Sequence, residues 1–212
     1  MTDKTHDPYV LPDGLPVPVD DGAADRLVGA VIPTVTLPSS EGDIDLDDFA
    51  ERFVLYVYPE TGPPEKPITP GWDEVPGARG CTPQSCGFRD LYSEIRAFGA
   101  RVAALSAQPI TEQLEFAART GMPFPIISDE DFVLATTFRL PTFEFGGRRF
   151  YKRLTLIAER GTVVKVFYPV FPPDLNASDV LAWLRSSTGR VVGRPVPAGA
   201  DSTKRDEGTI LA

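Results

Sequence analysis

The chain has 212 residues, of which 42% are hydrophobic, so it is long enough to bury the core of one ordinary domain. Its formal net charge of −9 argues against binding to nucleic acid or to anionic membranes, because both partners require a cationic surface. The N-terminal sequence lacks the apolar segment of a secretory signal, and no apolar run reaches the about 18 residues that span a bilayer, so we expect a cytoplasmic protein.

Both ends of the chain lack a hydrophobic pattern. Residues 1–27 are rich in Pro, Asp and Gly, and we expect a leader that wraps around the domain or stays mobile. Residues 189–212 are polar and aperiodic, which predicts a disordered tail. The folded domain is therefore expected over residues 28–188.

The first half of this domain contains strands and one long loop. Residues 35–46 predict a strand, a turn and a second strand, and residues 46–53 a short helix. The β-branched and aromatic run 53–59 is typical of a buried central strand. Residues 60–80 form a predicted loop, in which 60–76 is a proline-rich insert that lacks the N–H donors of a helix or an inner strand.

A helix is predicted after the loop. Pro83 is favoured as its first residue with Thr82 as the N-cap, and Gly99 is placed to end it. Its core face consists of apolar residues at helical spacing: Phe88, Leu91, Tyr92, Ile95 and Phe98.

The second half continues with alternating elements. The predicted order is a buried strand, a helix ending before Gly121, an edge or turn segment, a further helix, a β-hairpin that turns at 159–161 and an amphipathic closing helix. Their expected bounds are 101–106, 111–120, 123–129, 130–140, 148–170 and 176–188. This order indicates an α/β sandwich, in which a central mixed β-sheet is flanked by helices.

The only two cysteines, Cys81 and Cys86, admit several interpretations. A structural zinc site requires four ligands, which two cysteines and the remote His6 do not supply. A permanent disulfide is disfavoured in a reducing compartment, and Cα atoms five residues apart in a helix lie about 8.6 Å from each other, beyond the about 7 Å that a disulfide tolerates. Two buried apolar thiols remain an alternative that suits Cys86 better than Cys81.

Cys81 has the sequence context of a nucleophile. It follows Gly80 at the start of the predicted helix, where free N–H groups and the positive end of the dipole favour a thiolate. Arg79 lies two residues before it. The single histidine, His6, lies in the leader, which argues against a histidine base, a Ser-His-Asp triad or a multi-histidine metal site.

The segment "GCTPQSCGFRD" resembles the active-site segment of the peroxiredoxins (AhpC/TSA superfamily), in particular the PrxQ or bacterioferritin-comigratory type. "FVLYVYP", "PFPIISDED" and "KRLTLIAERG" resemble further segments of that family in the same order, and the resemblance covers roughly residues 27–187. It implies a thioredoxin-like fold and a thiol-dependent peroxidase that needs no metal, flavin or haem. Hydroperoxides would be the substrates, thioredoxin or a similar dithiol the reductant, and the oligomeric state a monomer or homodimer.

The resemblance also implies residue roles. Cys81 is similar to the cysteine that attacks peroxide and forms a sulfenic acid, and Cys86 to the resolving cysteine that then forms a disulfide with it. Arg153 matches the arginine that holds the thiolate and the peroxide; taken alone, it would read as a solvated strand charge. Pro59 matches the proline that closes the strand leading to the site.

One position departs from the family pattern. Ala78 stands three residues before Cys81, where the family carries a threonine whose hydroxyl orients peroxide. The insert can supply a substitute, with Thr61 or Thr69 as candidates. Thr69 is the expected one, because "ITPG" resembles the family's Thr-Pro-Gly; otherwise the site works with the arginine and backbone N–H groups alone. Trp72 either covers the pocket or pins the insert to the domain.

A second class of function remains open. The Cys81–Cys86 pair could be a redox sensor or binding module that modulates a partner and has only weak peroxidase activity. A disulfide reductase of the same superfold would normally carry Cys-x-x-Cys, which is not the spacing found here.

Overall fold

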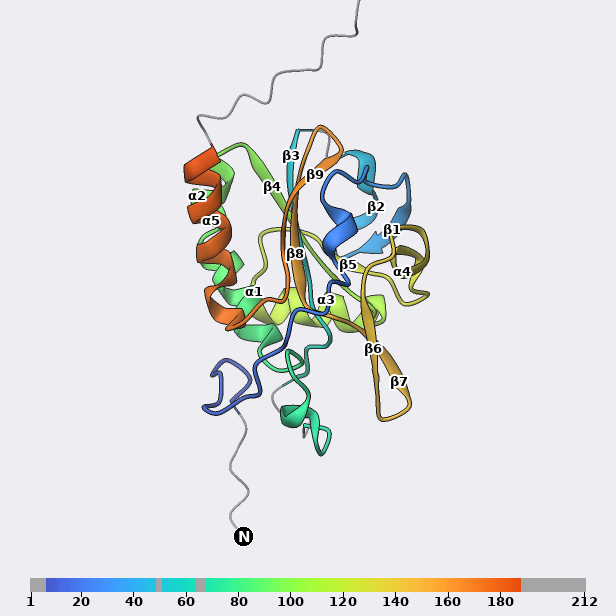
Figure 1. Cartoon of the computed structure of the whole chain (residues 1–212), viewed down its shortest axis with the longest axis vertical. Helices are drawn as coiled ribbons and strands as arrows, with labels where there is room; N and C mark the ends of the chain where they lie inside the picture. Colours follow the sequence, from blue (N-terminus) through green and yellow to red (C-terminus); the bar gives the residue numbers. More distant parts are fainter. Residues whose placement is uncertain (1–6, 49–50, 64–67, 188–212) are drawn as a thin grey trace, which may run out of the picture.

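A seven-stranded sheet in the order β2-β1-β5-β4-β3-β8-β9 forms the centre of the molecule (Figure 1). The computed structural model describes residues 7–48, 51–63 and 68–187. The strands of this sheet are β1 (Thr36–Ser39), β2 (Gly42–Asp45), β3 (Arg52–Val57), β4 (Ala100–Ser106), β5 (Ile126–Ser128), β8 (Leu154–Glu159) and β9 (Thr162–Phe167). β3 pairs parallel with β4 and antiparallel with β8, so the sheet is mixed, as the sequence predicts.

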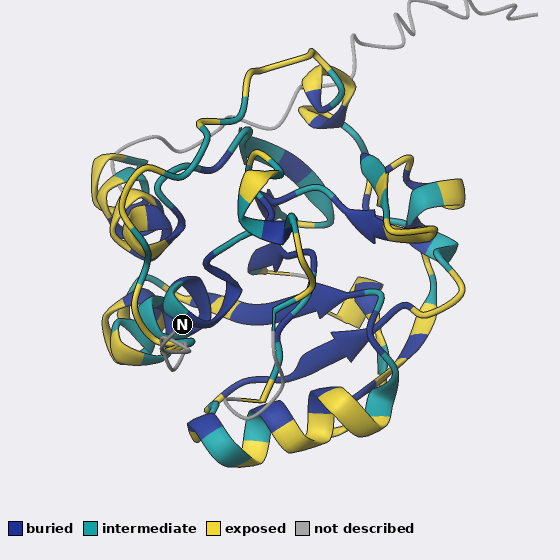
Figure 2. Cartoon of the chain, turned by 90° about the horizontal axis from the view of Figure 1, so that it is seen from below, coloured by how far each residue is buried: buried dark blue, intermediate teal, exposed yellow. Residues whose placement is uncertain are grey.

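Side chains of β3 alternate between two cores on opposite faces of the sheet. Phe53 and Leu55 join one cluster, and Val54 and Tyr56 join the other, which is the two-residue period of a strand buried on both sides. Figure 2 shows the strands buried between more exposed elements. The predicted buried central strand is therefore confirmed.

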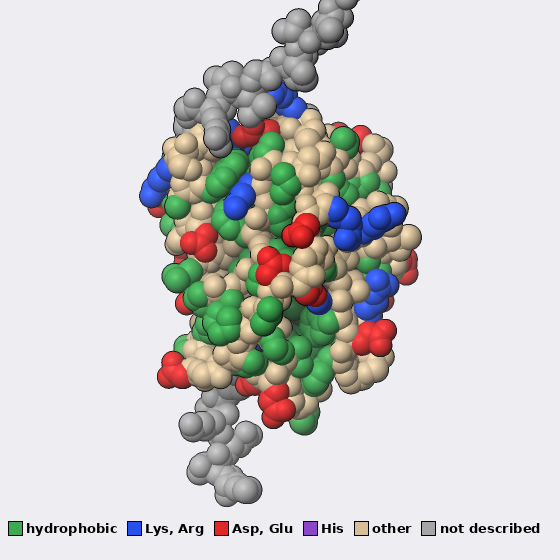
Figure 3. Space-filling view, in the orientation of Figure 1, with side chains coloured by type: hydrophobic (Ala, Val, Ile, Leu, Met, Phe, Trp, Pro, Cys, Tyr) green, Lys and Arg blue, Asp and Glu red, His purple; other side chains and the backbone are tan. Residues whose placement is uncertain are grey.

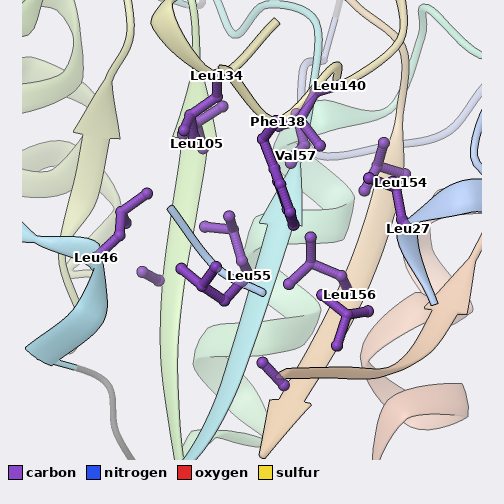
Figure 4. Close-up of a cluster of buried hydrophobic side chains, with 14 of the residues drawn as sticks. Leu27, Leu46, Leu55, Val57, Leu105, Leu134, Phe138, Leu140, Leu154 and Leu156 are labelled. Atoms are coloured by element: carbon purple, nitrogen blue, oxygen red, sulfur yellow. The ribbon is translucent and has the colours of Figure 1, made fainter. Parts of the chain in front are cut away.

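Helices cover both faces of the sheet. The helices are α1 (Cys81–Asp90), α2 (Tyr92–Ala97), α3 (Ile110–Thr120), α4 (Val133–Thr137) and α5 (Asn176–Ser187). Side chains from α1, α2, α3 and α5 pack into the cluster that contains Tyr56. On the opposite face, Leu134 of α4 and Leu27 and Leu46 of two 3-10 turns, η1 (Asp25–Leu27) and η2 (Leu46–Asp48), pack on the strands (Figure 4).

The described part of the leader packs on the domain. Ala24 and Leu27 are buried in the first core cluster, and Asp21 accepts hydrogen bonds from Lys152 and Tyr168. Other leader side chains are solvent-exposed, among them Tyr9, Val10, Val17 and Val19. Figure 3, in the orientation of Figure 1, shows hydrophobic side chains gathered on the lower part of the face turned to the viewer.

Several predicted elements are confirmed and others are shifted. β1 and β2 form the expected strand pair, α3 ends at Gly121 in the left-handed conformation, and β8 and β9 form the expected hairpin. The predicted closing helix is α5, whose expected last residue, Thr188, lies outside the described residues together with the tail 189–212.

The predicted helix over 46–53 is wrong. The chain makes only the turn η2, residues 49–50 lie outside the described part, and Arg52 and Phe53 already belong to β3 because they pair with both β4 and β8. The edge or turn assignment of 123–129 is also wrong. Within it, β5 lies between β4 and β1 inside the sheet.

The helix predicted from Pro83 to Gly99 starts earlier and is interrupted. It begins at Cys81, with Gly80 rather than Thr82 at the N-cap, and Leu91 separates α1 from α2. The helix predicted over 130–140 shrinks to α4, because the Asp129 carboxylate accepts hydrogen bonds from the backbone N–H groups of Val133 and Leu134 and fixes the start there.

A small second sheet lies beside the insert. β6 (Thr142–Phe145) and β7 (Arg148–Tyr151) form an antiparallel hairpin. The sequence predicts no strand at β6 and assigns the residues of β7 to the longer hairpin over 148–170, so this small sheet is a correction. Trp72 of the insert packs on this hairpin, with ring centroids 4.9 Å from Phe150 and 5.5 Å from Phe145. The hairpin thus gives the insert an aromatic platform.

No helix in the described ranges is long and apolar enough to cross a membrane. Within those same ranges, no three His, Cys, Asp or Glu side chains cluster as metal ligands would.

Candidate active site

Gly80 sets the start of α1 and therefore the position of Cys81. Its φ of 95° lies in the left-handed region that favours glycine. A Cβ at this position would overlap Pro173 Cγ and lie 2.7 Å from Leu11 Cδ1. Because the leader and the turn before α5 close in on this backbone, only glycine fits, and Cys81 becomes the first residue of the helix.

The Arg153 guanidinium lies against the Cys81 thiol. Its Nη2 donates to Cys81 Sγ at 3.1 Å, and the side chain is only 3% exposed. The same nitrogen donates to the carbonyls of Ala78 and Arg79 at 3.1 and 3.0 Å, and Nε donates to that of Gly77 at 3.2 Å. The backbone before α1 therefore fixes the cation beside the sulfur.

A buried polar chain continues from Arg153 away from the sulfur. Its Nη1 donates to Gln84 Oε1, and Gln84 Nε2 donates to Asn176 Oδ1 at 2.9 Å. Asn176 Oδ1 also accepts a hydrogen bond from Thr155 Oγ1 at 2.6 Å. These hydrogen bonds join α1, the start of α5 and β8 beneath the thiol.

A small cavity borders Cys81. Its volume is about 80 Å³, enough for a few molecules of the size of water. The walls come from the leader, the insert and the start of α1: Pro8, Glu60, Thr61, Gly62, Pro63, Ile68, Thr69, Trp72, Ala78, Arg79, Gly80, Cys81 and Thr82. A small substrate that enters this cavity would meet both the sulfur and the start of the helix.

Both threonines that could replace the missing hydroxyl border this cavity, but they differ in burial and in how firmly hydrogen bonds hold them. The Thr61 side chain is buried, and its hydroxyl donates to Gln108 Oε1 at 3.1 Å. Gln108 also binds both backbone groups of Thr61, at 2.8 Å each. Thr69 is exposed, and its backbone carbonyl accepts a hydrogen bond from the Trp72 N–H at 2.9 Å. Thr61 is therefore the more rigidly held hydroxyl.

Trp72 combines the two roles that the sequence left open. It lines the cavity and is only 7% exposed because it packs on the β6–β7 hairpin. Ala78 belongs to the same cluster and is fully buried. Its methyl group thus packs against aromatic side chains, while its carbonyl oxygen faces Arg153 and Cys81.

The second thiol, Cys86, lies one and a half turns along α1. Both cysteines are free, and the helix is continuous between them. Cys86 is half-buried, and burial raises the pKa of its thiol above the ordinary range. Because helical geometry holds the two residues too far apart for a disulfide, a bond between them requires the first turns of α1 to unwind.

The sequence predicts Cys81 and Arg153 in one site, and the structure brings them together. The sequence does not predict the neighbouring polar residues Gln84, Gln108 and Asn176. One signal was present for Gln84, since it lies three residues after Cys81 and therefore on the same side of α1. Asn176 gave no such signal, because an Asn at a helix start reads as a cap.

Residues 27–184 match the family described as Redoxin. Peroxiredoxin Q, chloroplastic, of Sedum lineare is 30% identical over 74% of this chain and 77% of its own length. The protein of the same name from Gentiana triflora is 29% identical over 75% of this chain and 67% of its own length.

Solved structures agree with these matches. The peroxidoxin BcpB of Mycobacterium tuberculosis superimposes with a TM-score of 0.61 at 27% identity, over 75% of this chain and 96% of that one. The fold is therefore thioredoxin-like, as the sequence predicts.

Proposed function

Because this chain belongs to the Redoxin family and is a peroxiredoxin of the PrxQ/Bcp type, we propose that Cys81 is its peroxide-attacking residue. The observation that carries this assignment is the Arg153 guanidinium, which lies 3.1 Å from Cys81 Sγ at the start of a helix and beside a small cavity. Hydrogen peroxide or an organic hydroperoxide is the proposed substrate.

In the first step the Cys81 thiolate attacks the terminal oxygen of the hydroperoxide. The S–O bond forms as the O–O bond breaks, and sulfur is oxidised to a sulfenic acid while the peroxide is reduced to water or an alcohol. Arg153 is the proposed group that stabilises charge moving onto the leaving oxygen. The free N–H groups at the start of α1 support the same charge.

The second step joins the two sulfurs. After the start of α1 unwinds, the Cys86 thiolate attacks the Cys81 sulfenic acid, and the S–S bond forms as hydroxide leaves and takes up a proton to give water. An external dithiol, of which thioredoxin is the proposed example, then reduces the disulfide by exchange. The cycle uses no metal, flavin or haem.

For the hydroxyl that Ala78 lacks, we propose a replacement from the insert. Thr61 and Thr69 both border the cavity, and Thr61 is favoured because three hydrogen bonds to Gln108 hold it in place. This choice gives the proline-rich insert 60–76 a direct part in the site. We further propose a cytoplasmic protein that acts as a monomer or homodimer.

Turnover with thioredoxin, its reductase and NADPH tests the proposed function. The wild-type protein should consume NADPH when hydrogen peroxide is added, Cys81→Ser should consume none, and Cys86→Ser should lose multiple turnover. Fast oxidation of the wild-type protein without recycling by any dithiol would instead favour the redox sensor.

A further inference from the structure

Gln84 meets the catalytic cation through the oxygen of its amide. Its Oε1 accepts from Arg153 Nη1, while its Nε2 points the other way toward Asn176 Oδ1 at 2.9 Å. The two ends of a glutamine amide have nearly the same shape, so packing alone does not decide which end faces the guanidinium. The reversed amide would place N–H donors against a cation that has no acceptor.

Asn176 supplies the reason for the observed orientation. Its Oδ1 accepts the hydrogen bond from Gln84 Nε2, and the hydrogen bond from Thr155 holds that oxygen in place. All three side chains are at most 1% exposed, so water does not compete for these groups. Without Asn176, the Gln84 NH₂ group would lose its acceptor in a buried site, which penalises the productive orientation of the amide.

The orientation of the Gln84 amide matters because the Arg153 guanidinium is planar and rigid. Nη1 and Nη2 belong to the same plane, so the contact of Nη1 with Gln84 helps to set where Nη2 lies relative to Cys81 Sγ. We propose that Asn176, at the start of α5, is a positioning residue for peroxide reduction that acts on Arg153 by orienting the Gln84 amide. This inference rests on the proposed chemistry of Cys81.

The test uses the full-length chain with Cys86→Ser, in which only Cys81 reacts, and measures the second-order rate of its oxidation by hydrogen peroxide. Asn176→Leu fills similar space without an acceptor and should slow the rate about tenfold, the size expected when one buried donor loses its acceptor. Asn176→Ala serves the same comparison if leucine prevents folding. Val180→Ala, which loosens the core contact of α5 but removes no polar group, is the control and should leave the rate unchanged.

A double-mutant cycle separates orientation from simple packing. In Gln84→Glu both ends of the side chain are acceptors, so its orientation no longer matters, and Asn176→Leu should then change the rate by less than about threefold. The same tenfold loss in both backgrounds, or no loss in the Gln84 background, would overturn the role of Asn176. If the Cys86→Ser reference itself were not oxidised, the proposed function would fail instead.

Discussion

The Arg153 guanidinium donates a hydrogen bond to Cys81 Sγ at 3.1 Å although the two residues lie 72 positions apart in the chain. The contact depends on the order of strands, because Arg153 directly precedes β8, and β8 pairs with β3, whose end leads through the insert to α1. The central sheet therefore helps to place Arg153 beside the Cys81 sulfur.

Replacing Arg153 with Ala should slow oxidation of Cys81 by about 10²-fold, the typical effect of removing one preorganised donor from a site of developing charge. Stopped-flow measurement with hydrogen peroxide gives the rate. Arg149→Ala is the matched control, because Arg149 is exposed on β7 and donates to Thr142. An unchanged rate in Arg153→Ala would remove the arginine from the mechanism.

Thr61→Val and Thr69→Val compare the two candidate hydroxyls with nearly isosteric substitutions. Thr61→Val should slow peroxide oxidation about tenfold, corresponding to one lost hydrogen bond to a reacting group, and Thr69→Val should change it less than about threefold. The reverse pattern would assign the role to Thr69. Equal wild-type rates in both variants would mean that the site works without a substitute hydroxyl.

Gly80→Ala should destabilise the protein by about 2–5 kcal/mol, since the new methyl group adds overlap with Pro173 to left-handed backbone strain. Gly99→Ala is the control, because Gly99 has φ 73° but no atom within 4 Å of the added Cβ. In Gly99→Ala the free energy of unfolding should fall by only about 1–2 kcal/mol, the cost of left-handed backbone strain alone. Urea unfolding compares them, and equal losses would contradict the close approach at Gly80.

The pKa of Cys86 is raised because the thiol is half-buried in the folded protein. The unfolded chain ionises first as pH rises, so the contribution of Cys86 to stability is full below the ordinary thiol range and is lost as pH increases through the raised folded value. In a Cys81→Ser background, unfolding midpoints should therefore fall more steeply at alkaline pH with Cys86 than with Cys86→Ala. Parallel pH profiles would show that burial of Cys86 does not affect its ionisation.

The sequence predicts the strands of the central sheet, except the short β5, because they carry periodic signals. The buried run around Tyr56 and the hairpin that turns near Gly161 are both visible as patterns. The ends of helices and strands are harder to predict from the sequence, because they depend on contacts with distant residues. Asp129 shortens α4 through its side chain, and the start of α1 depends on the close approach of Pro173 and Leu11 to Gly80.

The residues of the candidate site are likewise predicted only in part. Cys81, Cys86 and Arg153 are accessible through a family resemblance, whereas periodicity alone would read Arg153 as a surface charge. Gln84 and Asn176 were not predicted, since a polar residue on a helix is normally assigned to solvent. The role proposed for them depends on burial and on a hydrogen bond between two helices that are separated along the chain by the central strands.

The most direct test of the central claim is mass spectrometry of the reduced protein after one equivalent of hydrogen peroxide. We predict that the wild-type chain loses two hydrogens and yields a peptide pair linked through Cys81 and Cys86. The Cys86→Ser variant should gain one oxygen, trapped by dimedone on Cys81. An adduct on Cys86 in the Cys81→Ser variant, with peroxide consumption as fast as that of the wild type, would contradict the account.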